Sequence, residues 1–484
     1  MRYPVVILSL AMAGSPLAAT TTTAPAKVPT KAKPAVKAAA PAAPVAPATP
    51  APAPAPAAVP VAPAATAPAP YLPPALPHIG PSATEAAPVA EVAAPVTPEE
   101  KPEPSKFVPL YQFHYMEAVD TINIGSFFFG SGMGTTMGGR WAFTPGQALY
   151  GAYELNYSGP GLRPQEGREF TERDLSHQAS LGHEWSPVSG LALGSRALFQ
   201  RQMRRSGGSD VFGTGLYDYW TIGLTERADM KLAGFATGAS LSYALVHFPN
   251  YTDLLNEYQS ASVEAEKSGG LQDYNRITTS FDGKFLGQGA GWVNLTWMMF
   301  EHQKVLTDKG VPNTTAQFDS IYELGASWAQ PLAGDSGSSI LSVEPSVNVA
   351  VKRSNQNFLK YPKFGDLVNF EFVKDYYSDV SPTISAPLKW SFKAGTALFL
   401  SPSYSMLAYS SRPPRDATGT YLLGKKQSNS TFILTTGVST SWHRFARVSF
   451  GYSVHVQQSN NRFERFLPYN YVGHVFFTSL DLAY

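Results

Sequence analysis

Hydrophobic and polar side chains alternate with a period of two through most of the chain that follows residue 106. Residues 191–205, 276–285, 341–352 and 447–457 each place apolar side chains at one parity and polar side chains at the other. Successive side chains of a β-strand point to opposite faces of the sheet. The pattern therefore predicts a series of extended strands, each with one apolar face and one polar face.

Short turns and longer polar loops are predicted to separate these strands in strict alternation. The short turns are expected at 144–147, 187–190, 229–231, 287–291, 332–338, around Pro387 and at 443–446. The longer loops are expected near 120–133, 158–173, 205–214, 248–272, 303–316, 353–370, 411–427 and 459–470. This alternation predicts about sixteen strands, with 14 or 18 as the alternatives, and places both chain ends on the turn side. A first strand at 108–119 competes with one at 127–129.

The composition of the polar face decides between a soluble sandwich and a membrane barrel. A sandwich buries its apolar face and exposes a face rich in charge. Here the polar positions carry mainly serine, threonine, glycine and glutamine, and strands end at aromatic residues such as Trp185, Trp328 and Trp442. Membrane barrels have aromatic residues at both lipid interfaces and a polar interior. We therefore predict an all-β fold for 107–484, a transmembrane antiparallel up-and-down β-barrel wide enough for an aqueous channel.

The last predicted strand, 472–484, carries Phe476, Leu480 and Leu482 on one face and stops at Tyr484. It resembles the terminal strand of bacterial outer-membrane β-barrels, whose final aromatic residue belongs to the signal read by the barrel-assembly machinery. The resemblance implies that Phe476, Leu480, Leu482 and Tyr484 form this signal. It also implies that outer-membrane lipid surrounds the barrel in a Gram-negative bacterium.

The first 106 residues differ in composition from the rest of the chain. Residues 1–19 read as a signal peptide, with Arg2, a short apolar run and small residues before the cleavage region. Residues 20–106 contain 23 of the 41 prolines. Proline lacks a backbone donor and fixes φ, so this segment is predicted to be a disordered, extended periplasmic arm. The arm is expected to be a solvated spacer, and the alternative is a tether that binds peptidoglycan or a periplasmic protein.

Charge and cysteine content exclude several functions. Charged residues make up 15% of the chain, the formal net charge is +1 and there is no cysteine. A chain without a basic excess is a poor ligand for nucleic acid. The absence of cysteine excludes disulfides and thiolate metal sites. We expect neither a metal nor a cofactor.

No catalytic set emerges from the sequence. His455 and Ser459 resemble the His and Ser of outer-membrane phospholipases, but in that family a single residue separates the two. Four residues apart on a strand, their Cα atoms would lie about 13 Å from each other. The glycine-rich segment 130–139 lacks the following helix and Lys-Ser/Thr ending of a phosphate-binding loop, so it is interpreted as a flexible loop. The protein is not expected to be an enzyme.

The charged residues at polar-face positions are the candidates to line the lumen. They are Glu154, Glu184, Arg196, Arg204, Arg276, Asp282, Lys284, Asp319, Glu323, Glu344, Lys352, Arg447 and Asp481. Rings of one sign would indicate ion selectivity. Because the signs are mixed, the set predicts either a weakly selective pore or a lumen closed by salt bridges. The longest loop, with a helix-compatible stretch at 254–267, is interpreted as a constriction, a lid or a mobile surface loop.

Two further resemblances bear on function. General porins constrict the lumen with the loop after strand five, which is short here (205–214). The C-terminal barrels of polysaccharide exporters are also similar, although their helical periplasmic domain is replaced by the Ala/Pro arm. The leading hypothesis is a hydrophilic channel for small polar solutes or an exported polymer. The alternative is a structural anchor whose arm tethers peptidoglycan or a periplasmic partner.

Overall fold

The computed structural model describes residues 107–123, 126–144, 146–161, 171–205, 211–232, 235–251, 272–285, 288–309, 312–334, 339–360, 371–392, 395–464 and 469–483. The predicted signal peptide and arm (1–106), the stretch 254–267 and Tyr484 lie outside these residues. Within them, no helix is long and apolar enough to cross a membrane.

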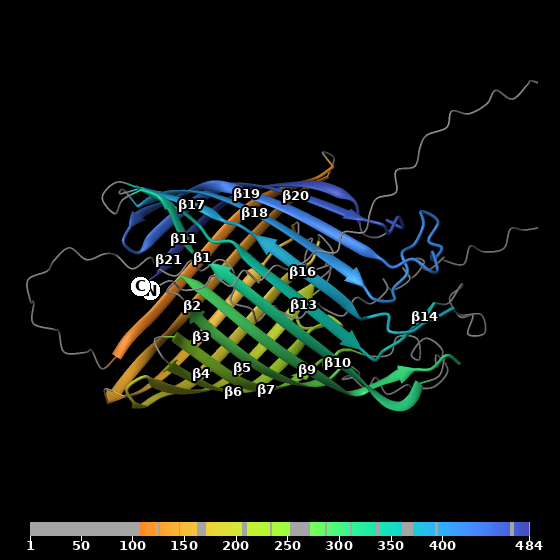
Figure 1. Cartoon of the computed structure of the whole chain (residues 1–484), viewed down its shortest axis with the longest axis horizontal. Coiled ribbons are helices and arrows are strands. Elements are labelled where there is room, and N and C mark those ends of the chain that lie inside the picture. Colours follow the sequence, from red (N-terminus) through yellow and green to blue (C-terminus); the bar gives the residue numbers. More distant parts are fainter. Residues whose placement is uncertain are drawn as a thin grey trace, which may run out of the picture. The chain divides into compact units, whose positions relative to one another are not determined.

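Nineteen of the described strands pair into one sheet (Figure 1). They are β1 (Phe107–Ile122), β2 (Ser126–Thr144), β3 (Gln147–Ser158), β4 (Arg173–Val188), β5 (Leu191–Arg205), β6 (Tyr219–Leu232), β7 (Phe235–His247), β8 (Tyr274–Phe285), β9 (Gly289–Leu306), β10 (Pro312–Trp328), β11 (Gln330–Ala333), β12 (Ser339–Val343), β13 (Ser346–Ser354), β16 (Asp379–Ser385), β17 (Leu388–Phe392), β18 (Thr396–Tyr409), β19 (Ser428–His443), β20 (Ala446–Ser459) and β21 (Tyr471–Ala483). A separate two-stranded sheet, β14 (Phe358–Lys360) with β15 (Glu371–Val373), lies in the connection between β13 and β16.

The sheet closes on itself. β1 pairs with β21 in antiparallel register from Gln112 opposite Ala483 to Ile122 opposite Gly473. Closure leaves no unpaired edge, as a bilayer requires, because lipid offers no hydrogen bonds to backbone groups. The result is an all-β, closed, antiparallel barrel with sixteen strand positions around its wall, here called staves. This confirms the predicted fold class and strand count.

Three staves consist of two strands each, namely β10 with β11, β12 with β13, and β16 with β17. Two of the breaks fall at Pro345 and Pro387, since proline cannot donate to the ladder. Their carbonyl groups still accept bonds, from the N–H of Trp328 at 3.0 Å and of Glu344 at 2.9 Å. The staves are therefore bent at the prolines without losing their neighbours.

Pro387 was interpreted as a turn, and this prediction is wrong. The chain reverses instead between β17, which ends at Phe392, and β18, which begins at Thr396, and Gly395 just before β18 adopts a φ of +72°. The turn predicted at 229–231 is also misplaced, because β6 continues to Leu232. A proline inside an alternating segment marks a lost donor, and the sequence alone does not tell a bend from a reversal.

The long loop predicted at 120–133 is wrong as well. β1 ends at Ile122 and β2 begins at Ser126, so the glycine-rich segment 130–139 is strand rather than flexible loop. The candidate first strand and the competing 127–129 are both strands, paired through Val119 opposite Phe129. Glycine is required at Gly130 because a Cβ there would lie 2.2 Å from the carbonyl oxygen of Pro160. The glycines that permit this close approach of two backbone segments were thus wrongly interpreted as the mark of a flexible loop.

The two faces of the barrel differ in chemistry. Leu181, Leu224, Leu241 and Leu324 share one face, and each is more than half exposed. On the opposite, polar face, side chains reach across an entire intervening strand, as Arg227 of β6 does to Asp282 of β8. Side chains converge in this way only on the concave side of a cylinder. The polar face therefore surrounds the lumen, and the apolar face points outward to lipid.

Candidate functional site: the lumen wall and its mouth

The register places the charged candidates around the barrel. Those that lie in strands share the lumen face: Glu154 on β3, Glu184 on β4, Arg196 and Arg204 on β5, Arg276, Asp282 and Lys284 on β8, Asp319 and Glu323 on β10, Lys352 on β13, Arg447 on β20 and Asp481 on β21. Glu344 lies in the break between β12 and β13, outside any strand. The structure brings these residues into several small clusters rather than one ring.

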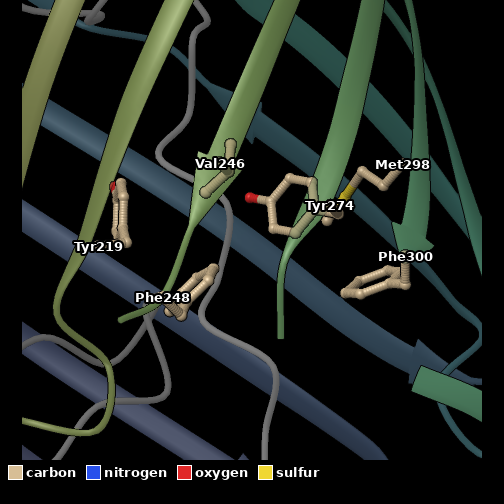
Figure 2. Packing of buried hydrophobic residues seen from close by; sticks show 6 residues of the cluster. All are labelled: Tyr219, Val246, Phe248, Tyr274, Met298 and Phe300. Atoms are coloured by element: carbon tan, nitrogen blue, oxygen red, sulfur yellow. The ribbon is translucent and has the colours of Figure 1, made fainter. Parts of the chain in front are cut away.

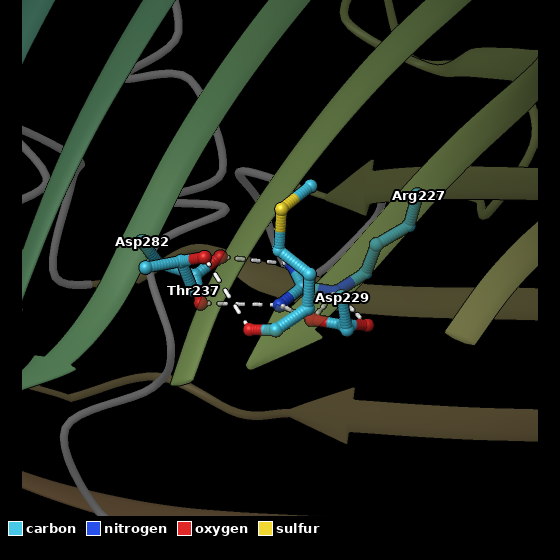
Figure 3. Close-up of polar contacts among 5 residues, drawn as sticks. Arg227, Asp229, Thr237 and Asp282 are labelled. Atoms are coloured by element: carbon cyan, nitrogen blue, oxygen red, sulfur yellow. Dashed lines mark hydrogen bonds and ion pairs between the residues drawn. The ribbon is translucent and has the colours of Figure 1, made fainter. Parts of the chain in front are cut away.

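The first cluster lies in the half of the barrel nearest the short turns, where Figure 3 shows Arg227 between two carboxylates. Its guanidinium donates to Asp229, at 2.6 Å from Nη2, and to Asp282, at 2.9 Å from Nη1. Gly238 of β7 lies between them, and a Cβ on it would approach Nη2 to 2.3 Å. The glycine therefore opens the space through which Arg227 links β6 to β8.

Arg140 repeats this arrangement four strands away along the barrel wall. It lies on β2 and donates from Nε to Glu184 of β4 at 2.8 Å, across strand β3. Ala148 of β3 pairs with Glu184 and has no exposed surface. At the closing seam, His114 of β1 and Asp481 of β21 are joined at 2.6 Å. Arg140 and Glu184 carry opposite charges, and His114 carries the charge opposite to that of Asp481 when its ring is protonated.

Buried charges gather at the end of the barrel that bears the long loops. Arg204 donates from Nε to Asp174 at 3.1 Å, and Glu172 lies 3.7 Å from the same nitrogen. The backbone N–H of Arg204 donates to Asp218 at 2.6 Å. Burial raises the pKa of the Asp218 carboxyl, and the N–H groups of Arg204 and Gly215 oppose that rise. This cluster fixes the loop before β6 to the ends of β4 and β5.

A second buried cluster lies where β10, β13 and β16 end. Asp319 is 1% exposed, and its carboxylate lies 3.2 Å from Nζ of Lys352. Lys352 is directly opposite Asp379 of β16 in the ladder. The ammonium group thus neutralises the carboxylate of Asp319 in a site shielded from water, where an uncompensated charge would be costly.

Aromatic side chains also pack on the lumen face near the long loops (Figure 2). Tyr219, Phe248, Tyr274 and Phe300 form a row with ring centroids 5.3, 6.2 and 5.1 Å apart, and each is buried. The hydroxyl of Tyr219 donates to Gln202 at 2.6 Å. The row joins four neighbouring staves at the mouth and gives that edge of the barrel an apolar core of its own.

Two arginines, Arg412 and Arg415, pack together the loops at the long-loop ends of β16 to β20. The guanidinium carbon of Arg412 lies 4.8 Å from the ring centroid of Tyr376 and 4.7 Å from that of Tyr409. Arg415 covers the rings of Tyr421 and Phe463 at 4.5 and 5.5 Å. Such cation–π contacts are strongest when desolvated, and Arg412 is buried. The described part of these loops is therefore a packed structure.

The wall built from β13 and β16 to β21 is lined mainly by hydroxyl groups. Its lumen positions include Ser346, Ser381, Thr383, Ser385, Ser401, Ser403, Ser405, Thr431, Thr435, Ser439, Ser449, Ser453 and Ser479. Neighbouring hydroxyls bond to one another, as Ser346 does with Ser385 at 2.7 Å. The lumen thus has a hydroxyl wall, defined by these residues, opposite a wall that carries most of the charge clusters.

The histidine of the phospholipase comparison has a different partner from the one considered. His455 Nε2 lies 3.0 Å from Oγ of Ser453, whereas Ser459 donates to Asn429 at 2.7 Å. Ser453 also lies 2.9 Å from the Thr435 hydroxyl and is 4% exposed. A substrate carbonyl cannot reach a hydroxyl so enclosed, so the pair fits a structural hydrogen bond between lumen residues.

Several lumen charges were missed by the sequence analysis. Arg227 and Asp229 were passed over because the turn was expected at 229–231, although the alternation continues through both. Arg140 directly follows the segment 130–139 that was interpreted as a loop, and Asp174 and Asp379 lie at strand ends where the period is too short to assign a face. Extending the same period-two pattern along the chain would have identified Arg227, Asp229 and Arg140.

Taken together, an even number of antiparallel strands, closure, short turns at one end, long loops at the other and an apolar outer face define an outer-membrane β-barrel protein. The chain therefore belongs in the outer membrane.

Known proteins resemble this chain only distantly. No family model and no curated protein matches the sequence. Among solved structures, the trimer form of OmpT from Vibrio cholerae matches with 11% identity and a TM-score of 0.39, over 78% of this chain and 100% of that one. A bacterial polysaccharide outer membrane secretin matches with 10% identity and a TM-score of 0.36, over 78% and 98%. The ferric enterobactin receptor of Pseudomonas aeruginosa matches with 10% identity and a TM-score of 0.36, over 77% of this chain and 81% of that one.

Proposed function

We propose that the barrel is a channel that lets small hydrophilic solutes or an exported polymer cross the outer membrane. The observation that carries the proposal is the largely polar lumen face, with hydroxyl groups on one wall and most of the paired charges on the other. Polar solutes exchange hydrogen bonds with water for hydrogen bonds with such a surface at little net cost. Paired charges of both signs support weak ion selectivity.

An enzymatic function is not part of the proposal. The enclosed hydroxyl of Ser453, bonded to both His455 and Thr435, speaks against nucleophilic catalysis at the one Ser–His contact considered. The second candidate is the anchor, in which 20–106 binds peptidoglycan or a periplasmic protein and the barrel only holds it in the membrane.

Planar-bilayer conductance separates the two candidates. The purified full chain and a variant lacking residues 20–106 are reconstituted, and single-channel steps are recorded in KCl. The channel predicts discrete steps of the same size from both proteins, with a small reversal potential in a salt gradient. A folded barrel that conducts no ions in either form, while the full chain alone binds peptidoglycan sacculi, would reverse the proposal in favour of the anchor.

A further inference from the structure

A groove opens on the outside of the barrel, at the long-loop end of β18 to β21. Its volume is about 810 Å³, within the range of small-molecule sites. The outward-facing lining residues are Tyr404, Met406, Ser428, Ser430, Val456, Gln458 and Val472, together with Asn123, Asn460, Arg462 and Asn470. Small serines on β19 lie between larger side chains on β18 and β20, and this difference in size makes the hollow.

The register orders the groove by polarity along the barrel axis. Tyr404, Phe432, Val456 and Val472 form one cross-strand row of apolar side chains. The next row toward the loops is mixed, with Met406, Ser430 and Gln458, and the one beyond it is polar, with Ser428 and Asn460. The groove thus changes from apolar to polar along the direction in which a bilayer changes from acyl chains to head groups.

Positive charge collects at the polar end. Arg462 is exposed and is held by its backbone N–H, which donates to the carbonyl of Arg415 at 2.7 Å. Asn460 donates from its side chain to the carbonyl of Lys426 at 2.8 Å, which fixes exposed Lys425 and Lys426 beside the groove. The carboxylate of Glu464 also lies at this end, where it accepts from the side chain and the backbone of Asn470 at 2.8 Å. The cations therefore outnumber the acids around the head-group end.

We propose that this groove binds one anionic, phosphorylated lipid of the outer leaflet. Long loops lie on the outer side of such barrels, so the groove lies at the outer leaflet. Its apolar row would contact the acyl chain, while Arg462 and Lys426 would pair with the phosphate. The side-chain amides of Asn123 and Asn460 can each donate to the glycerol or sugar region, whereas both N–H groups of the Asn470 amide already donate, to Asn461 and Glu464. This inference is independent of transport through the lumen.

The test is native mass spectrometry of the full chain, released from detergent in the presence of dioleoylphosphatidylglycerol or dioleoylphosphatidylcholine. The wild-type protein should retain one phosphatidylglycerol in preference to phosphatidylcholine. The double variant Lys426→Gln/Arg462→Gln should lose affinity for the first phosphatidylglycerol by roughly fivefold for each positive charge removed. The matched control Lys309→Gln/Lys374→Gln, which removes two exposed cations from other connections at the same end, should bind as the wild type does.

A second variant, Ser430→Trp, fills the groove without changing its charge and should abolish retention of the first lipid. Heat-dependent migration on gels confirms that each variant is a folded barrel. Equal losses in the two double variants would mean diffuse surface attraction and would overturn the site. So would unchanged lipid retention in Ser430→Trp, or a change in oligomeric mass alone, which would make the groove a contact between copies of the chain.

Discussion

Arg227 and Asp282 are joined by an ion pair of 2.9 Å although strand β7 lies between their own strands. The contact passes over Gly238, where any side chain would collide with the guanidinium. One arginine thereby holds two carboxylates, those of Asp229 and Asp282, on the lumen face. The arrangement sets the local charge that a passing ion would meet.

Replacing this arginine should change ion selectivity. Arg227→Gln leaves two carboxylates without their cation, so the pore should favour cations by roughly two- to fivefold more than the wild type, since one charge at 4 Å in water is worth about 1 kcal/mol. Reversal potentials in a KCl gradient measure the shift. Arg444→Gln, in the exposed turn between β19 and β20, is the control. A shift toward anions would contradict the proposed lumen geometry.

The pair Asp319–Lys352 should reveal the cost of a buried unpaired charge. Lys352→Met leaves the carboxylate of Asp319, 1% exposed, without its 3.2 Å partner. We expect the free energy of unfolding to fall by about 3–5 kcal/mol. Urea denaturation of the detergent-refolded barrel gives this value. Adding Asp319→Asn should restore most of the loss, and additive losses in the double variant would argue against coupling between the two residues.

Phe248 should anchor the aromatic row at the mouth. It is 1% exposed and packs on Tyr219 and Tyr274. Phe248→Ala should destabilise this edge by about 3–5 kcal/mol, whereas Phe248→Leu keeps most of the buried apolar volume and should lose less. Hydrogen exchange at the ends of β6 to β9 reports the local opening. Protection that is unchanged from the wild type in both variants would show that the row contributes no local stability.

The loop around Asp416 should respond to acid. The Thr418 hydroxyl and the N–H groups of Thr420 and Thr418 donate to the carboxylate, and these bonds hold its pKa below the usual range. Because the folded pKa is depressed, the ionised carboxylate stabilises the turn at neutral pH. That contribution is lost as pH falls from about 4 through the folded pKa. The Thr418 and Thr420 amides should lose protection over that interval in the wild type, measured against the intrinsic exchange rate at each pH, but not in Asp416→Ala.

The terminal aromatic residue gives a prediction about assembly. If the C-terminal strand is read by the barrel-assembly machinery, Tyr484→Ala should lower the amount of folded protein in the outer membrane. The stability of the barrel once folded should change little. Comparing heat-dependent gel migration of cell-assembled and refolded protein separates the two effects. A variant that assembles normally in cells would remove Tyr484 from the proposed signal.

The sequence was sufficient for the number of staves and the two faces, because the period-two pattern persists wherever large apolar residues alternate with polar ones. It was insufficient at 130–139, since glycine has no side chain to carry the pattern on either face. It was also insufficient at Pro387, where a missing donor fits both a turn and a bend.

The contacts between lumen side chains could be found only from the register in which the strands pair. Nothing in the sequence indicates that Arg227 and Asp282, 55 residues apart, face each other across a glycine. The same holds for His455, whose partner is Ser453 rather than Ser459. A shift of one residue in pairing would move every such side chain to the opposite face. Strand alternation predicts which residues are polar-facing, and only the closed ladder shows which of them meet.

The seam between β1 and β21 joins residues that are more than 350 positions apart, as Thr121 and His474 are. The first strand to be made must therefore wait, with its hydrogen-bonding edge unsatisfied, until the last strand has been delivered. An exposed edge of this kind recruits other strands, and pairing so distant in sequence is slow to form. Until then the incomplete sheet can pair with strands of other chains, and any delay in adding the thirteen residues of β21 prolongs that exposure.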